Sequence, residues 1–278
     1  MDKRRKIVQF ITAFLYNPHL GNLFKGGLYK GETKGVCVPG LNCYSCPAAA
    51  GSCPLGSLQQ SLASVKKGVN TYVIGFLLMF AALFGRFVCG WLCPFGLLQE
   101  LIYKIPVPKC LKRFKWLGWI KYAHLAILVL LIPILTAIQK GMGYPAFCKY
   151  ICPQGTIGGL FLIRTSEALR DQVGLIFVIK ILILAGILIT SSFIFRPFCR
   201  FICPLGAIYG LFNKIALIRI RYNKGACTSC GLCQKNCPMK LNPVKECNHP
   251  DCIRCGKCIK ACPEKALAFT AKKSSAGK

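Results

Sequence analysis

Acidic side chains are scarce in this sequence, which has 8 Asp and Glu against 37 Lys and Arg and a formal net charge of +29. Such an excess is typical of proteins that bind nucleic acid or an anionic membrane surface. The apolar share of 54% and the mean hydropathy of +0.49 are too high for an ordinary soluble protein and favour the membrane class. We therefore expect the chain to have the lipid bilayer as a partner, and no nucleic acid.

The sequence also lacks features that define other classes. No small-residue cleavage site follows the basic start, residues 1–6, and the short apolar stretch after it, so the pattern of a signal peptide is absent. Without a secreted context, 20 cysteines do not favour a disulfide scaffold. A nucleotide-binding fingerprint and a nucleophilic triad are missing too. These absences favour an electron-transfer subunit over a stand-alone enzyme.

Four apolar runs are predicted to cross the membrane, because a helix needs about 20 residues to span about 30 Å of hydrocarbon. They cover residues 117–138, 174–195, 70–92 and, with polar interruptions, 7–24. The loop 104–121 holds six Lys and Arg and no acid, which places it on the cytoplasmic side. We therefore expect a multi-pass protein of the cell membrane, with the N-terminus and the C-terminal domain in the cytoplasm.

An internal repeat divides the chain. The motif Cys-Pro-x-Gly occurs four times. In the last three copies, a further cysteine lies four residues before the cysteine of the motif. The repeat predicts a transmembrane domain over 1–218 with two related halves, about 1–105 and 106–218. A cytoplasmic ferredoxin domain over 219–270 and a basic, disordered tail over 271–278 follow.

The C-terminal cysteines have the spacing of bacterial ferredoxins, Cys-x2-Cys-x2-Cys-x3-Cys-Pro, twice in succession. In this motif three thiolates bind one [4Fe-4S] cluster and the fourth reaches the other cluster. The spacing assigns Cys227, Cys230, Cys233 and Cys262 to one cluster, and Cys252, Cys255, Cys258 and Cys237 to the second. Zinc also binds Cys-x2-Cys pairs, but two complete successive motifs are far more specific. Gly231 and Gly256 suit the sharp turns that the motif requires.

The cysteines of the helical part predict one or two further clusters. A proline after the second cysteine suits the first position of a new helix, whose positive end favours a thiolate. Cys89, Cys93, Cys199 and Cys203 would supply an inner site near the cytoplasmic ends of two spans. The candidates for an outer site are Cys43 or Cys46 with Cys53, Cys148 and Cys152. The alternative is that these thiols are merely buried small apolar groups, which four copies of one motif disfavour.

Three basic residues near these cysteines allow two interpretations. Arg86 and Arg196, each three residues before a cysteine, either donate hydrogen bonds to cluster sulfurs or anchor the chain at the cytoplasmic surface. Lys180, six residues into its span, is expected to extend towards the outer lipid headgroups.

The Cys-x3-Cys-Pro-x-Gly repeats, the segment GLNCYSCPAAAGSCPLGSLQ and the double ferredoxin motif resemble the NapH/NosR/CcoG-like group of membrane polyferredoxins. The resemblance covers nearly the whole chain. It implies electron transfer between a cytoplasmic or quinol donor and a redox partner at or across the membrane. Alanine at position 49, where this repeat would carry a cysteine, leaves the outer ligands open between Cys43 and Cys46.

The expected fold is mostly α: a polytopic transmembrane helix bundle with two related halves and a small C-terminal α+β ferredoxin domain with two [4Fe-4S] clusters. The leading hypothesis is a transmembrane electron wire whose partners are redox proteins, including flavin- or haem-containing subunits, or quinone. A separation of about 30 Å between inner and outer sites would be long for one electron step. The segments around the cysteines would then have to enter the bundle, or another carrier would intervene. The alternatives are a protein for maturation or redox sensing of a metalloenzyme, and a quinone or metal reductase acting at one face.

Overall fold

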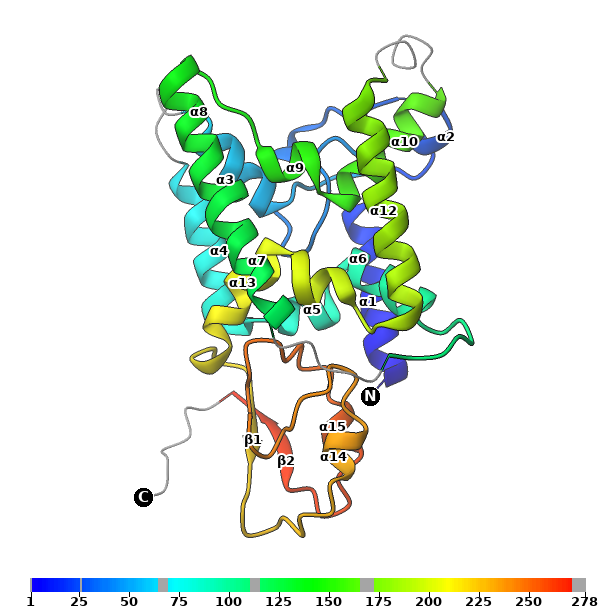
Figure 1. The fold of residues 1–278 in the computed structure, drawn as a ribbon, viewed down its shortest axis with the longest axis vertical. Helices are drawn as coiled ribbons and strands as arrows, with labels where there is room; N and C mark the ends of the chain where they lie inside the picture. The colour runs from blue at the N-terminus through cyan, green and yellow to red at the C-terminus, as the bar shows by residue number, and fades with distance from the viewer. Residues whose placement is uncertain (1, 26, 65–69, 111–115, 166–172, 272–278) are drawn as a thin grey trace.

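The computed structural model describes residues 2–25, 27–64, 70–110, 116–165 and 173–271. Helices form the larger part, and a small domain with two strands lies at one end of it (Figure 1). The helical part consists of α1 (Asp2–Tyr16), α2 (Asn22–Lys25), η1 (Glu32–Gly35), α3 (Pro54–Leu62), α4 (Thr71–Phe84), α5 (Phe87–Trp91), α6 (Pro94–Ile102), η3 (Trp116–Trp119), α7 (Ile120–His124), η4 (Leu125–Leu131), α8 (Ile132–Lys140), α9 (Ala146–Tyr150), α10 (Pro153–Thr165), α12 (Leu175–Phe193), η5 (Phe198–Ile202), α13 (Pro204–Leu211) and η6 (Phe212–Lys214).

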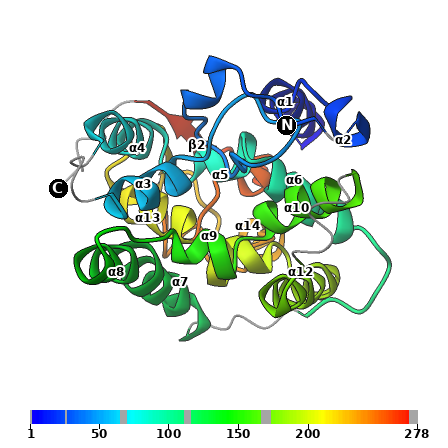
Figure 2. The same ribbon diagram turned by 90° about the horizontal axis from the view of Figure 1, so that it is seen from above.

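Several long helices surround three short ones. Seen along the long axis, α1, α4, α8 and α12 lie at the periphery, and α5, α9 and α13 lie nearer the centre (Figure 2). The N-terminus lies at the same end of the molecule as the small domain (Figure 1). The predicted tail beyond residue 271 lies outside the described residues.

Among the residues that the structure describes, two helices are long and apolar enough to cross a membrane: α12, with 19 residues, and a continuous helix of 25 residues, Trp116–Lys140. They agree with the runs predicted at 174–195 and 117–138. The second combines η3, α7, the π-helical η4 and α8. Pro133 explains the π-helical stretch before it, because its nitrogen has no hydrogen to donate to a carbonyl of the preceding turn.

The other two predicted spans are wrong as single helices. Over 70–92, α4 ends at Phe84 because the chain turns at Gly85, with φ of +51°, and only then enters α5. Over 7–24, α1 ends at Tyr16, just before Asn17 and Pro18. With 14 residues α4 is about 21 Å long, which is less than the hydrocarbon thickness of about 30 Å. The sequence pattern did not reveal the break at Gly85, whereas Asn17 and Pro18 are among the polar interruptions noted in 7–24.

The small domain is a two-stranded antiparallel sheet with two short helices. Strands β1 (Arg219–Tyr222) and β2 (Leu267–Thr270) pair with Arg219 opposite Thr270. Helices α14 (Leu232–Lys235) and α15 (Lys257–Lys260) follow Gly231 and Gly256, and both glycines have a φ of +74°. The predicted sharp turns at these glycines are confirmed, since other residues are strained at such angles.

Candidate iron–sulfur sites and the contacts between them

Each Cys-Pro-x-Gly segment begins a helix. The prolines are the first residues of α3, α6, α10 and α13, as the motif predicts. The cysteine before each proline therefore lies at a helix N-terminus, where the first backbone N–H groups have no partner within the helix. This arrangement favours a negatively charged thiolate at all four places.

The predicted inner cysteines surround one cavity in the helical part. Cys89, Cys93, Cys199 and Cys203 all line it and all are buried. Their thiols are close enough to interact electrostatically with one another. Residues 39–41 of the loop before α3 complete the cavity wall. The structure thus brings together four thiols from the two halves of the chain.

The two halves hold this site through a reciprocal exchange of arginines. Arg86 donates to the carbonyl oxygen of Cys199, and Arg196 donates to the carbonyl oxygen of Cys89. Both arginine side chains are fully buried. Arg86 is also a hydrogen-bond partner of the Cys89 thiol. These arginines are therefore parts of the site, and the interpretation as surface anchors does not describe them.

The glycine of the motif makes room for these arginines. A Cβ atom on Gly96 would lie 2.9 Å from Nη1 of Arg196, and one on Gly206 would lie 2.9 Å from Nη2 of Arg86. Real Cβ atoms do not approach that closely. A methyl group at either position would therefore displace the guanidinium of the arginine from the other half.

Arg86 and Arg196 each share a carboxylate with a second cation. Arg196 and Arg5 both pair with Glu100, at 2.7 Å and 2.6 Å. In the same way Arg86 pairs with Asp251 at 3.0 Å, and Lys121 pairs with that carboxylate as well. A buried cation requires such a partner because its desolvation is costly.

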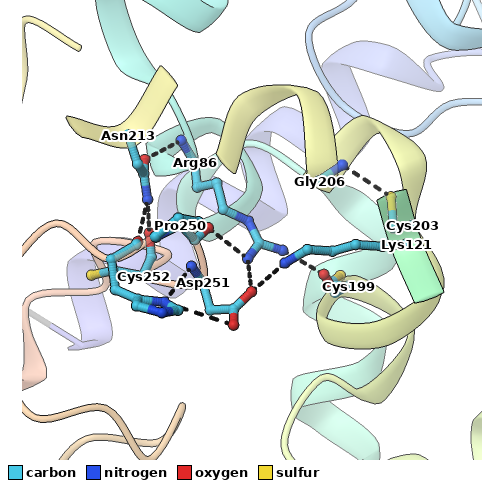
Figure 3. A network of polar contacts seen from close by, with 10 residues as sticks. Arg86, Lys121, Cys199, Cys203, Gly206, Asn213, Pro250, Asp251 and Cys252 are labelled. Atoms are coloured by element: carbon cyan, nitrogen blue, oxygen red, sulfur yellow. Dashed lines mark hydrogen bonds and ion pairs between the residues drawn. The ribbon is translucent and has the colours of Figure 1, made fainter. Parts of the chain in front are cut away.

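Asp251 belongs to the small domain, so its ion pairs join the two parts of the chain. Figure 3 shows its carboxylate between Arg86 and Lys121, with Cys199 on the far side of the arginine. Burial favours a raised pKa of Asp251, but the charges of Arg86 and Lys121 outweigh it and hold that pKa below its usual value. The carboxylate therefore stays ionised.

Asn213 fixes the loop that carries Cys252. Its side-chain nitrogen donates to the carbonyl oxygens of His249, at 2.9 Å, and Cys252, at 2.8 Å. Its side-chain oxygen accepts the backbone N–H of Arg86 at 2.9 Å (Figure 3). One amide thus ties the backbone of the inner site to the backbone of the small domain.

The small domain also makes a close backbone contact beside the inner cysteines. Trp91 donates its indole N–H to the carbonyl oxygen of Arg254 at 3.1 Å. A Cβ atom on Gly90 would lie 2.1 Å from the carbonyl oxygen of Ile253. Only glycine at position 90 allows this approach.

The predicted outer cysteines form a second group. The thiols of Cys43, Cys53, Cys148 and Cys152 interact electrostatically, and Cys53 and Cys152 are buried. Cys43 lies with Cys152 against Gly155, since a Cβ atom on Gly155 would stand 3.7 Å from the Sγ of Cys43 and 3.9 Å from the Cβ of Cys152. Cys46 acts on the thiol of Cys43. Its backbone packs against Gly158, whose Cβ would meet the Cα of Cys46 at 3.3 Å. Of the two alternatives, the structure brings Cys43 to the outer site.

Lys180 does not extend away from the site as expected. Its ammonium donates to the carbonyl oxygen of Cys148 at 3.5 Å, and its charge acts on Cys43 and Cys152. It is half-buried on α12. The charge is therefore directed at the outer thiols rather than at the membrane surface.

The inner and outer groups meet at two adjacent residues of the loop before α3. The backbone N–H of Leu41 faces the thiol of Cys93, and the N–H of Asn42 faces the thiol of Cys53. Tyr209, fully buried, lies beside both groups and donates its hydroxyl to the carbonyl oxygen of Pro39 at 3.0 Å. The irregular segment thus enters the bundle, and the two sites are much closer than the thickness of a bilayer.

The small domain has two cavities, each surrounded by one predicted set of cysteines. Cys227, Cys230, Cys233 and Cys262 line one, and Cys237, Cys252, Cys255 and Cys258 line the other. The first lies near the surface, with Cys230 exposed, whereas Cys255 and Cys258 of the second are buried. Burial raises the pKa of the Cys252 thiol to about 12.

The shape of these sites fits a cluster better than a single ion. Four sulfurs around one zinc ion lie only about 3.8 Å apart, given Zn–S bonds of about 2.3 Å. Within the described residues, no three Cys, His, Asp or Glu side chains come together closely enough to hold one metal ion. Thiols spaced around a cavity suit a cuboidal cluster, which supplies one-electron redox chemistry when bound. Which cysteines ligate clusters stays a prediction.

Several residues of these sites were missed by the sequence analysis. Gln59 and Gln99, both fully buried, donate to the thiols of Cys148, at 3.3 Å, and Cys199, at 3.2 Å. The signal was present, since each glutamine comes six residues after the second cysteine of its repeat. Asp251 has no such signal, because distant contacts alone define its role.

Comparison with known families agrees with this arrangement. The chain matches a family described as 4Fe-4S binding domain three times, over residues 72–115, 122–164 and 176–224. Each match contains one complete Cys-x3-Cys-Pro-x-Gly repeat. A second family with the same description matches residues 248–268, within the small domain. The chain therefore belongs to the ferredoxin-type 4Fe-4S proteins, which transfer electrons.

Within that class the chain is a polyferredoxin, similar to several known proteins. It is 27% identical to the methylamine utilization ferredoxin-type protein MauN of Methylobacillus flagellatus, over 84% of this chain and 74% of that one. It is 27% identical to YccM of Escherichia coli, named for electron transport, over 65% of this chain and 48% of that one. The regulatory protein NosR of Stutzerimonas stutzeri is 29% identical over 60% of this chain and 22% of its own length. No solved structure matches the chain.

Proposed function

We propose that the protein conducts electrons through four [4Fe-4S] clusters, from a cytoplasmic donor to a redox partner on the opposite side of the membrane. Electrons would pass the four sites in the order in which the sites adjoin one another. They would enter at the exposed site of Cys230, pass the buried site of Cys255 and the inner site, and end at the outer site. The observation that carries the proposal is the junction at Leu41 and Asn42, which contact the inner and outer cysteines through adjacent N–H groups.

The transfer from the small domain to the inner site is supported by the contact between Gly90 and Ile253. Gly90 follows Cys89, and Ile253 follows Cys252. The residue next to a predicted ligand of the inner cluster therefore contacts the residue next to a predicted ligand of the buried cluster of the small domain. The ion pairs of Asp251 and the hydrogen bonds of Asn213 fix this contact.

Entry of electrons at the small domain is supported by exposure and charge. Cys230 is exposed, whereas all four inner cysteines are buried. A soluble donor thus reaches the site of Cys230 before any other. The domain has ten Lys and Arg against three acids in 219–270, which favours an acidic donor.

The membrane orientation rests on the two long apolar helices and the basic loop. The N-terminus lies at the end of the small domain (Figure 1). Trp116 and Trp119 are largely exposed at the start of the 25-residue helix, where tryptophans suit the level of the lipid headgroups. By the positive-inside rule this end faces the cytoplasm. The outer site then lies towards the other face and would serve a membrane or extracytoplasmic partner, or quinone.

Iron content and EPR test the proposal on the full chain purified without oxygen. Four clusters predict about 16 iron atoms and a similar amount of acid-labile sulfide per chain. The double variant Cys89→Ser/Cys203→Ser should lose about 4 of them, and the [4Fe-4S] EPR signals should diminish in proportion. If the wild type holds only about 8 iron atoms and this variant loses none, the inner thiols hold no cluster and the wire is wrong.

A second candidate function is the maturation or redox control of a partner metalloenzyme. It is favoured by the similarity to NosR, which is named a regulatory protein. In that case deletion of the protein would abolish assembly of the partner, while electron flux through an assembled partner would continue. The wire predicts the reverse: an assembled partner that receives no electrons.

A further inference from the structure

We propose that Gln99 and Gln59 raise the reduction potentials of the inner and outer clusters, each by donating a hydrogen bond to one cluster thiolate. The proposal rests on the proposed function, because it takes Cys199 and Cys148 as cluster ligands. The two glutamines are positioning residues that act on the cluster through a ligand sulfur.

The geometry at the inner site fixes which way the Gln99 amide points. Its Oε1 atom accepts the backbone N–H of Phe198 at 3.1 Å, and its Nε2 donates to the Sγ of Cys199 at 3.2 Å. A backbone N–H is a donor only, so the oxygen of the amide has to face Phe198. The amide nitrogen then has to face the sulfur.

The outer site has the same arrangement, built from other residues. Oε1 of Gln59 accepts the backbone N–H of Phe147 at 3.0 Å, and Nε2 donates to the Sγ of Cys148 at 3.3 Å. Both glutamines are fully buried, so water does not compete for either contact. Two separate sites with one geometry indicate a functional contact rather than an accident of packing.

At each site, only the repeat from the first half of the chain supplies such a glutamine. Gln59 and Gln99 lie six residues after Cys53 and Cys93, in the repeats of the first half. At the same offset the second half has Gly158 and Tyr209. Gly158 has no side chain to donate, and Tyr209 donates to the carbonyl oxygen of Pro39. Each site therefore receives one amide donor of this kind.

The direction of the effect follows from charge. Reduction adds one negative charge to a cluster, so an N–H donor stabilises the reduced form more than the oxidised form. A buried donor acts in a low dielectric, which strengthens its effect. Removing the donor should therefore lower the potential of that cluster.

The test is redox titration of the full chain, followed by EPR, in Gln99→Leu and Gln59→Leu. Each variant should lower the potential of its own cluster and leave the other unchanged. We expect about a tenfold fall in the ratio of reduced to oxidised cluster at a fixed potential, which corresponds to about 59 mV for one electron. Gln60→Leu is the matched control, because Gln60 is the exposed neighbour of Gln59 and should have no effect.

A second variant removes the amide donor with little change of shape. Gln99→Met keeps the length of the side chain and adds no charge, but it has no hydrogen-bond donor. A lowered inner potential in Gln99→Met, with iron retained, supports the proposal even if Gln99→Leu fails to fold. A wild-type potential in Gln99→Met overturns it and leaves the glutamine a structural role. Failure of the proposed function is distinguishable, because the wild type itself would then lack signals from the membrane clusters.

Discussion

Gly90 lies so close to Ile253 that a Cβ atom on Gly90 would stand 2.1 Å from the carbonyl oxygen of Ile253. The contact joins the residue after Cys89 to the residue after Cys252, and so joins the inner site to the ferredoxin-type domain. If electrons pass here, the closeness of the two backbones determines the rate.

Gly90→Ala should therefore slow electron transfer without removing any cluster. The methyl group cannot fit against the Ile253 carbonyl, so the two parts must separate at this point. We expect the reduction of the inner cluster, followed by rapid freezing and EPR, to slow at least about tenfold, which corresponds to about 1.4 kcal/mol in the barrier. Gly186→Ala on α12 is the matched control, since nothing lies within 4 Å of the added atom. Equal rates in both variants would show that the contact is not on the electron path.

Asp251→Asn should weaken the attachment of the small domain. It leaves Arg86 and Lys121 buried without their shared carboxylate, and breaking a buried ion pair costs about 3–5 kcal/mol. The variant should show faster proteolysis between the helical part and the small domain, and a lower unfolding temperature. Glu264→Gln removes an exposed acid from the same domain and should change neither. An unchanged cleavage rate in Asp251→Asn would mean that the ion pairs do not hold the two parts together.

Cys43→Ser and Cys46→Ser should differ in iron content. Cys43 acts on Cys148 and lies with Cys152 at Gly155, whereas the backbone of Cys46 packs against Gly158, so only the first change should remove the outer cluster. We expect Cys43→Ser to lose about 4 iron atoms per chain and Cys46→Ser to retain all of them. The opposite result would assign Cys46 as the ligand.

Lys180→Met should lower the potential of the outer cluster. A positive charge beside the outer thiols stabilises the more negative, reduced cluster, so its removal disfavours reduction. Lys149→Met removes an equal charge from an exposed side chain that packs on Tyr144, and should have a smaller effect. Redox titration of both variants measures the difference. A larger shift in Lys149→Met would contradict the placement of Lys180.

Local spacing predicted which cysteines of the small domain line a common cavity, because the residues of each motif lie within a few turns of backbone. The inner set was also predictable, since the repeat marks Cys89 and Cys199 as equivalent. The choice of Cys43 over Cys46 was not, because both lie in an irregular loop without a defined period. Nor was the break after α4, since the hydropathy of Gly85 does not report its positive φ.

The contacts between sites could not be predicted for a different reason. The junction at Leu41 and Asn42 and the approach of Gly90 to Ile253 depend on where separate segments meet. The same holds for Lys180, whose position in a long apolar run suggested the membrane surface. Its neighbours on α9 and in the outer loop place its charge at the thiols.

The central claim is that electrons pass from the ferredoxin-type domain through the inner site to the outer site. The most direct measurement uses the full chain in sealed liposomes, with the small domain outside and a membrane-impermeant reductant added there. In the wild type, EPR should show reduction of the outer cluster after that of the other clusters. In Cys89→Ser/Cys203→Ser, the clusters of the small domain should be reduced at the normal rate while the outer cluster stays oxidised. Reduction of the outer cluster at an undiminished rate in that variant would contradict the account.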